Sequence, residues 1–150
     1  MTVEEFWKNF IKEYPEYSDF SYEAWHFCAD EKNANELLQL TLDGIKRGTA
    51  SWEECYFVEG EDLPQVGNLS VVTDWEGNPG CVIRTEKIWT YPFKDVPASF
   101  AKIEGEGDGS LKYWKAAHLQ AFGMDSKMIN KPFTEDSRVI CEEFSVIYRA

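Results

Sequence analysis

The sequence predicts an α+β domain in which short, mostly antiparallel strands form a small barrel decorated by helices. Two observations predict this class. Helical patterns come first, strand patterns follow, and further helices and one last strand end the chain, whereas a doubly wound parallel sheet needs regular alternation. The chain also has 150 residues, 43% of them hydrophobic, which is enough for one domain to bury a core of its own.

The N-terminal segment carries the signals of an amphipathic helix over residues 2–14. Thr2 and Glu5 are spaced as a capping box, and bulky apolar residues recur every fourth position from Phe6. A proline follows directly and ends the pattern. We expect a second short helix over residues 22–28.

Three more helices are predicted at residues 33–44, 97–103 and 110–122. Gly44 provides the left-handed residue that commonly ends a helix. In the last of these helices His118 shares a stripe with apolar and aromatic residues. We therefore expect His118 to border a packed face rather than act as a ligand or base.

Four strands are predicted from alternating or β-branched patterns. They cover residues 49–58, 69–73, 81–91 and 139–148. Gly, Asn and Pro between the second and third strands predict a hairpin connection. Because no linker or repeat divides the chain, we expect one domain over residues 1–150, with residues 1–32 as a helical N-terminal extension packed on it.

Composition restricts the location and the partners. The N-terminus has acids instead of the basic and apolar segments of a signal peptide, and no apolar run is long enough for a membrane helix. The four cysteines are widely spaced. We therefore expect a cytoplasmic protein with free thiols. The net charge of −12 argues against strong binding to duplex DNA, whereas an uncharged nucleoside or a local contact with single-stranded RNA carries no such penalty. We expect no cofactor, no metal and no membrane contact.

Two segments combine glycine with polar side chains. Residues 44–51 hold two glycines, Lys46, Arg47 and two hydroxyl residues between a helix and a strand. The two cations also suit the negative end of the preceding helix, which is a purely structural explanation. Residues 103–110 alternate acids with glycines, but they lack the twelve-residue spacing and closing glutamate of a calcium loop.

Taken together, five segments make the chain resemble the ASCH domain family, in particular its single-domain bacterial branch. These segments are ANEL at 34–37, GIKRGTAS at 44–51, LPQVG at 63–67, EGEGDGSLKYW at 104–114 and VICEEF at 139–144. The resemblance implies a PUA-like β-barrel with a cleft between barrel and helices that accepts RNA or a nucleoside. Some members of the family deacetylate N4-acetylcytidine, and others are ribonucleases or RNA-binding modules, so the fold leaves the activity open.

The resemblance also implies which residues act. In the deacetylating members a lysine and a threonine three residues apart work with a glutamate, and these match Lys46, Thr49 and Glu106 here, with Glu104 as the second choice for the acid. Lys46 would be the base, Thr49 the nucleophile and the glutamate the acid. The residues expected to contact the substrate are Ser51, Arg84, Glu104 and Asp108.

Two functions remain open at this stage. A lysine can act as a base only if burial lowers its pKa enough to make it partly neutral, and a neighbouring glutamate opposes that. The first function is an amidohydrolase acting on an N4-acylated cytidine. The alternative is an RNA- or nucleotide-binding module without catalysis, or a ribonuclease of the same family, in which Lys46, Arg47 and Arg84 would contact phosphates.

Overall fold

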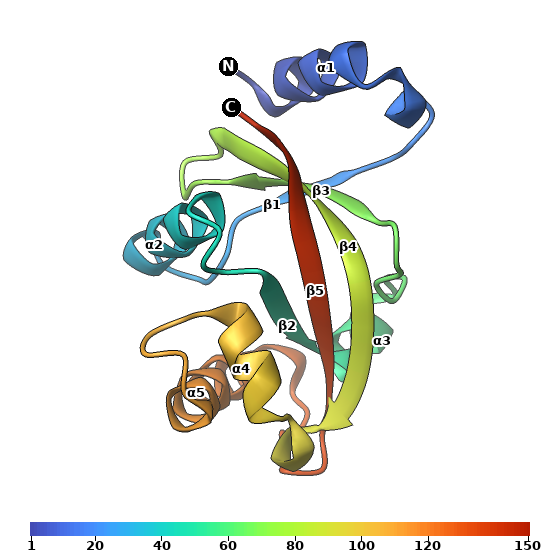
Figure 1. Cartoon of the computed structure of the whole chain (residues 1–150). Helices are drawn as coiled ribbons and strands as arrows, with labels where there is room; N and C mark the ends of the chain where they lie inside the picture. The colour runs from blue at the N-terminus through green and yellow to red at the C-terminus, as the bar shows by residue number, and fades with distance from the viewer.

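Five strands form one curled sheet in the order β1-β3-β4-β5-β2, which makes a half-barrel (Figure 1). The computed structural model describes all residues from 1 to 150. The strands are β1 (Glu23–Trp25), β2 (Gly48–Trp52), β3 (Leu69–Thr73), β4 (Pro79–Pro92) and β5 (Arg138–Arg149). The helices are α1 (Val3–Glu13), α2 (Glu31–Leu42), α3 (Glu53–Glu59), α4 (Ala98–Glu104) and α5 (Leu111–Ile129), with short 3-10 turns at Pro15–Tyr17 and Phe93–Asp95.

The sheet is antiparallel except for one pair. β1 runs parallel to β3, and the other three pairings are antiparallel. The ladder between β4 and β5 is the longest and is interrupted by two register shifts, which increase the local twist and curl the sheet. β1 and β2 lie at opposite edges and pair with no further strand, so the half-barrel has an open seam between them. This architecture confirms the predicted α+β class with a mostly antiparallel barrel.

Helix α1 covers one end of the sheet, near both chain termini (Figure 1). The predicted capping box is present, since Thr2 and Glu5 bond each other's backbone N–H. Phe6 and Phe10 are fully buried against the β3 and β4 side chains Val71 and Val82. The N-terminal segment is therefore part of the packed structure.

The other helices pack elsewhere on the half-barrel. α2 contributes Leu37 and Leu38 to a cluster with Phe144 of β5. α4 and α5 lie together at the end opposite α1 (Figure 1), where Phe100 and Trp114 join a second cluster. The end of α4 thereby lies against the start of β2, where Gly48 is close to the side chains of Ile103 and Phe100.

Two predicted elements were wrong. Residues 22–28 contain strand β1 instead of a helix, because residues 23–25 pair in parallel with β3 and tertiary pairing overrides a weak local pattern. The strand predicted at 49–58 ends at Trp52, and α3 takes the rest. Two acids in the first turn of α3 and Gly60 in the left-handed conformation at its end are the helix signals that the aromatic alternation concealed.

Two helix boundaries also differ from prediction. α2 begins at Glu31, because Asp30 caps it by accepting from the N–H of Asn33. α5 continues to Ile129, where Asn130 ends it with a φ of 55°. All four cysteines are free. None of the helices combines the length and the apolar composition needed to cross a membrane.

Replacing Phe10 by alanine tests whether α1 is part of the cooperative core. Phe10 is completely buried, so Phe10→Ala should lower the free energy of unfolding by about 3–5 kcal/mol in urea titrations. Lys8→Ala, which changes an exposed position of the same helix, should change it by less than about 0.5 kcal/mol. Equal, small effects from both variants would show that α1 is only loosely attached.

Candidate functional site

Lys46 is the most unusual side chain in the structure, because it is charged and almost fully buried. Helix α2 ends at Leu42, and Gly44 takes a φ of 76° that turns the chain inward. The N–H groups of Ile45 and Lys46 then both donate to the carbonyl of Leu40. This turn sends the Lys46 side chain into the interior, where only 1% of it is exposed.

The ammonium group of Lys46 has three oxygen partners. Its Nζ donates to the carbonyl oxygen of Gly48 at 2.7 Å, to Glu106 Oε2 at 3.0 Å and to Glu104 Oε1 at 3.2 Å. It also lies 4.9 Å from the centre of the Phe27 ring, within cation–π range. All three N–H donors of the ammonium are therefore satisfied, which is the condition for burying such a charge.

Glu104 connects this lysine to α5. Its second oxygen, Oε2, accepts from the indole Nε1 of Trp114 and lies 2.9 Å from His118 Nε2. The other ring nitrogen of His118, Nδ1, lies 2.8 Å from the carbonyl oxygen of Trp114. A backbone carbonyl and an ionised carboxylate only accept hydrogen bonds, so this geometry needs protons on both ring nitrogens of His118. Two cations thus balance two carboxylates.

The pKa values agree with that charge assignment. Burial alone pulls the pKa of Lys46 down, but the carboxylates of Glu104 and Glu106 outweigh it and hold that pKa above the usual range. Burial likewise opposes the charge on Glu104, yet Lys46 and His118 lower its pKa to about 2. Burial also lowers the pKa of His118, and Glu104 more than reverses the effect. The four groups form a buried, mutually dependent ion cluster.

Backbone geometry fixes the cluster in place. Gly105, between the two glutamates, ends α4 with a φ of 65°, and a Cβ there would collide with the carbonyl oxygen of Ile45. Only glycine therefore lets the acidic loop approach the turn that carries Lys46. The N–H of Arg47 donates to the carbonyl of Ile103 and joins the same two segments.

Glu104, Glu106 and His118 could also be considered as metal ligands, because their ligand atoms lie within 4.8 Å of one another. The Lys46 ammonium, however, already lies at hydrogen-bond distance from both carboxylates. A divalent cation there would face a like charge at close range. The cation that this donor set holds is the lysine.

A cavity of about 560 Å³, here called the seam cavity, opens on the inside of the half-barrel. All five strands contribute to it, and helix α3 with the loop after it completes the wall. The lining residues used below are Tyr22, Glu23, Thr49, Ser51, Tyr56, Glu61, Asp62, Thr85 and Glu142. Thr49 directly follows Gly48, whose carbonyl accepts from Lys46, so one peptide unit of β2 links the ion cluster to the seam cavity.

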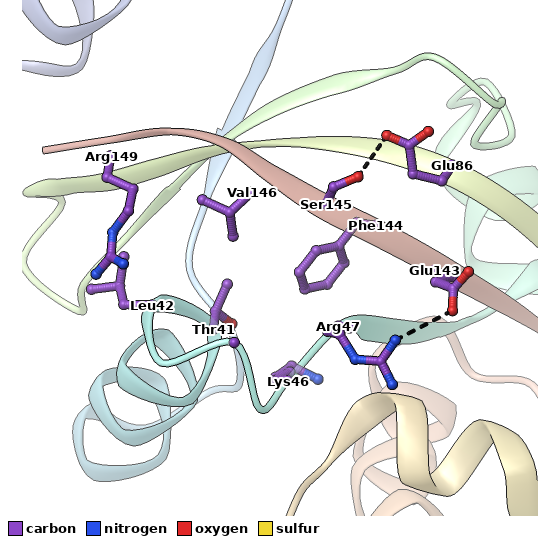
Figure 2. Close-up of a pocket in the computed structure, with 11 residues that line it drawn as sticks. Thr41, Leu42, Lys46, Arg47, Glu86, Glu143, Phe144, Ser145, Val146 and Arg149 are labelled. Carbon is purple, nitrogen blue, oxygen red and sulfur yellow. Dashed lines mark hydrogen bonds and ion pairs between the residues drawn. The ribbon is translucent and has the colours of Figure 1, made fainter.

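A second cavity of about 540 Å³, here called the edge cavity, lies beside β5 beyond the point where β2 stops pairing with it (Figure 2). Arg47 and Arg149 reach into this region, and Arg47 pairs with Glu143 at 3.7 Å. Arg149 forms no ion pair. Lys46 also lines this cavity, but its ammonium is committed to the interior carboxylates.

The structure brings some of the predicted site residues together and separates others. Lys46, Glu104 and Glu106 meet in the ion cluster, whereas Thr49 and Ser51 line the seam cavity and make no hydrogen bond to Lys46. Other predicted contacts lie outside both sites. Arg84 pairs with Glu86 at 2.7 Å and bonds the Tyr17 hydroxyl, and Asp108 is exposed and accepts from the Ser110 N–H.

Two residues with functional potential escaped prediction. His118 was expected to border a packed face, and it does stack on Trp114, but its ring also pairs with Glu104. Glu142 lies on β5 opposite Thr49 and faces the seam cavity. The available signal was its position two residues before the buried Phe144, which places a carboxylate on the inner face of a strand.

Comparison with known proteins identifies relatives of similar sequence and shape. The model of the ASCH domain matches residues 23–148. The crystal structure of an ASCH domain from Lactobacillus crispatus JV V101 is 37% identical, with a TM-score of 0.92 over 97% of this chain and 94% of that one. A protein from Enterococcus faecalis V583 is 31% identical, with a TM-score of 0.90 over 98% and 88%. No curated protein matches the chain.

Neutralising Glu104 tests the ion cluster. Glu104→Gln leaves Lys46 and His118 without their shared counter-charge, so it should lower the free energy of unfolding by about 3–5 kcal/mol at pH 7. Because the carboxyl pKa is about 2 in the folded state and 4.5 normally, the wild type should lose this advantage as the pH falls from 4.5 toward 2. Urea titrations at several pH values measure the difference.

Glu36→Gln, an exposed change on α2, provides the matched control and should leave stability within about 0.5 kcal/mol of the wild type. A Glu104→Gln protein as stable as this control at pH 7 would contradict the charge assignment of the cluster.

Proposed function

The chain belongs to the ASCH domain family, and from that membership and the buried ion cluster we propose that it is an amidohydrolase that removes the acyl group from an N4-acylated cytidine. The observation that carries the proposal is the Lys46 ammonium, held between two carboxylates one peptide unit away from a cavity of small-molecule size. A charged lysine costs more free energy to bury than an apolar residue of similar size. Side chains with strongly shifted pKa values are concentrated at functional sites.

The raised pKa of Lys46 favours a particular division of roles. Amide hydrolysis needs a group that takes a proton from the nucleophile and a group that gives one to the departing nitrogen. A lysine that stays charged at neutral pH can give a proton but cannot take one. In the proposed mechanism one N–H of Lys46 therefore leaves its present partner and Lys46 protonates the leaving N4 of the cytosine.

Glu106 is the matching proton acceptor. It bonds Lys46 at 3.0 Å, and its side chain is 16% exposed, whereas that of Glu104 is 2% exposed. Glu106 is thus the carboxylate that a bound substrate can reach, and Glu104 positions Lys46 and His118 from behind. The nucleophile in this scheme is the Thr49 hydroxyl, which lines the seam cavity.

The reaction balances in two steps. The Thr49 oxygen attacks the acyl carbon while its proton passes to Glu106, and the collapse of the tetrahedral intermediate expels the cytosine amine with a proton from Lys46. Water then attacks the acyl-threonine ester and releases the carboxylic acid, which regenerates the hydroxyl, and the proton held by Glu106 returns to Lys46 across their 3.0 Å hydrogen bond. The proposed mechanism requires the bound substrate to bring Thr49, Glu106 and Lys46 within hydrogen-bond reach, since such contacts are often looser in the free enzyme.

A second function, binding of RNA or a nucleotide without catalysis, is favoured by one observation. The edge cavity presents Arg47 and Arg149, and Arg149 has no carboxylate partner (Figure 2). Guanidinium groups bind phosphates well. In this alternative Arg47 and Arg149 carry the affinity, and Thr49 contributes little.

Substitutions at Lys46 and Thr49 distinguish the two functions. Lys46→Arg, Lys46→Ala and Thr49→Val should each lower kcat/KM for release of acetate from N4-acetylcytidine by about 100-fold or more, because each removes a proton-transfer or nucleophilic group. Thr49→Ser keeps the hydroxyl and should retain measurable activity. The measurement is cytidine formed per unit time by chromatography, with circular dichroism to verify folding.

Arg47→Ala is the matched control next to Lys46, since Arg47 is half exposed and belongs to the edge cavity. It should leave hydrolysis within about twofold of the wild type. If the wild type releases no acetate while Arg47→Ala and Arg149→Ala abolish binding of a single-stranded RNA, the hydrolase proposal is wrong and the binding module is supported.

A further inference from the structure

The charged residues that line the seam cavity all have the same sign. They are Glu23 on β1, Glu61 and Asp62 in the loop after α3, and Glu142 on β5. No lysine, arginine or histidine lines this cavity. A phosphate group entering it would meet four acidic side chains and no cation, so its desolvation would go uncompensated. The cavity is therefore suited to an uncharged ligand.

Glu142 is the one carboxyl group of this cavity that is partly buried, since Glu23, Glu61 and Asp62 are exposed. Thr85 Oγ1 donates to its Oε1 at 3.1 Å, and Oε2 has no partner in the protein. Every buried side-chain nitrogen or oxygen in the structure has a partner, so the unpartnered Oε2 is accessible from the cavity. No cation lies within ion-pair distance of Glu142, unlike the carboxylates of the ion cluster.

The surroundings of Glu142 favour its neutral form. Burial is the main cause that raises its pKa to about 7, and Glu23 adds to the shift while the Thr85 hydrogen bond opposes it. The groups that line the cavity with Glu142 include the hydroxyls of Tyr22, Thr49, Ser51, Tyr56 and Thr85 and the carboxyls of Glu23, Glu61 and Asp62. The pKa of Tyr56 is raised to about 12, so this hydroxyl stays neutral.

A neutral carboxyl group offers one O–H donor beside one carbonyl acceptor. The ring edge that complements this pair has an acceptor nitrogen next to an N–H donor, as N3 and N4–H of cytosine do. An N4-acylated cytidine keeps one N4–H beside N3, so it satisfies the same pair. Further hydroxyl contacts are available, because Tyr56 donates to Ser51 Oγ at 2.9 Å and leaves the Ser51 proton free to donate.

We propose that the seam cavity binds the uncharged pyrimidine ring of a free nucleoside, with Glu142 as the residue that recognises the N3 and N4–H edge in its carboxylic acid form. This inference rests on the proposed function and narrows it, because it selects a nucleoside without phosphate over a nucleotide or RNA. Glu142 acts here as a specificity-determining residue, and the proton-transfer groups remain those around Lys46.

Calorimetric binding of cytidine tests the inference without any hydrolysis, since cytidine has no acyl group. The affinity of the wild type should fall about 30-fold from pH 6 to pH 8.5, because only about one thirtieth of Glu142 is then neutral. Cytidine 5′-monophosphate should bind at least about tenfold more weakly than cytidine at both pH values.

Two variants of Glu142 make the test specific. Glu142→Gln has an amide with a fixed donor and acceptor, so it should bind cytidine as the wild type does at pH 6 and keep that affinity at pH 8.5. Glu142→Ala should lose about tenfold or more at pH 6. Glu36→Gln, an exposed acid on α2 outside the cavity, should leave the pH profile unchanged.

Three results would overturn the inference: no cytidine binding, an affinity of the wild type that does not change with pH, or nucleotide binding as tight as nucleoside binding. The wild-type affinity for cytidine at pH 6 against pH 8.5, and for cytidine against cytidine 5′-monophosphate, tests the inference even if a Glu142 variant fails to fold. Cytidine binding with the expected pH profile but no acyl release would reject the proposed hydrolysis alone. Acyl release with a flat binding profile would reject only the role of Glu142.

Discussion

The structure of this site depends on one interaction, the burial of the Lys46 ammonium between Glu104 and Glu106. An isolated ammonium could not remain in the interior, so the carboxylates, the Gly48 carbonyl and His118 must all be in place together. That requirement ties the turn after α2 to the end of α4 and the start of α5. Elements that are about 60 residues apart in the chain are thereby fixed at one end of the half-barrel.

The same ion cluster determines which chemistry is available. The family pattern of lysine, threonine and glutamate leaves open which of the three groups is the base. The structure shows two carboxylates on one lysine, and their combined effect exceeds the effect of burial on its pKa. The proposed mechanism therefore assigns proton donation to Lys46 and proton acceptance to Glu106. Charge also distinguishes the two cavities, since the charged residues that line the edge cavity have both signs, including two arginines, and those that line the seam cavity are all acids.

The fold class could be predicted from local signals in the sequence, namely capping residues and hydrophobic periodicity. The grouping of Lys46 with the acidic loop was instead implied by the resemblance to the ASCH family, because no local signal links residues about 60 positions apart. The sequence did not allow β1 to be predicted, since three residues form a strand only because β3 lies beside them. Glu142 was missed for a similar reason: its significance comes from Thr49 and Thr85 on two other strands.

The protonation state of Lys46 is the most direct test of this account. Nuclear magnetic resonance of the Lys46 side chain, assigned by loss of its signal in Lys46→Arg, gives the titration midpoint. We expect a midpoint above the ordinary lysine value of 10.5, with the ammonium fully protonated at pH 7. A midpoint near pH 7 would contradict the account, because Lys46 would then be available as a base and the carboxylates would not control its charge.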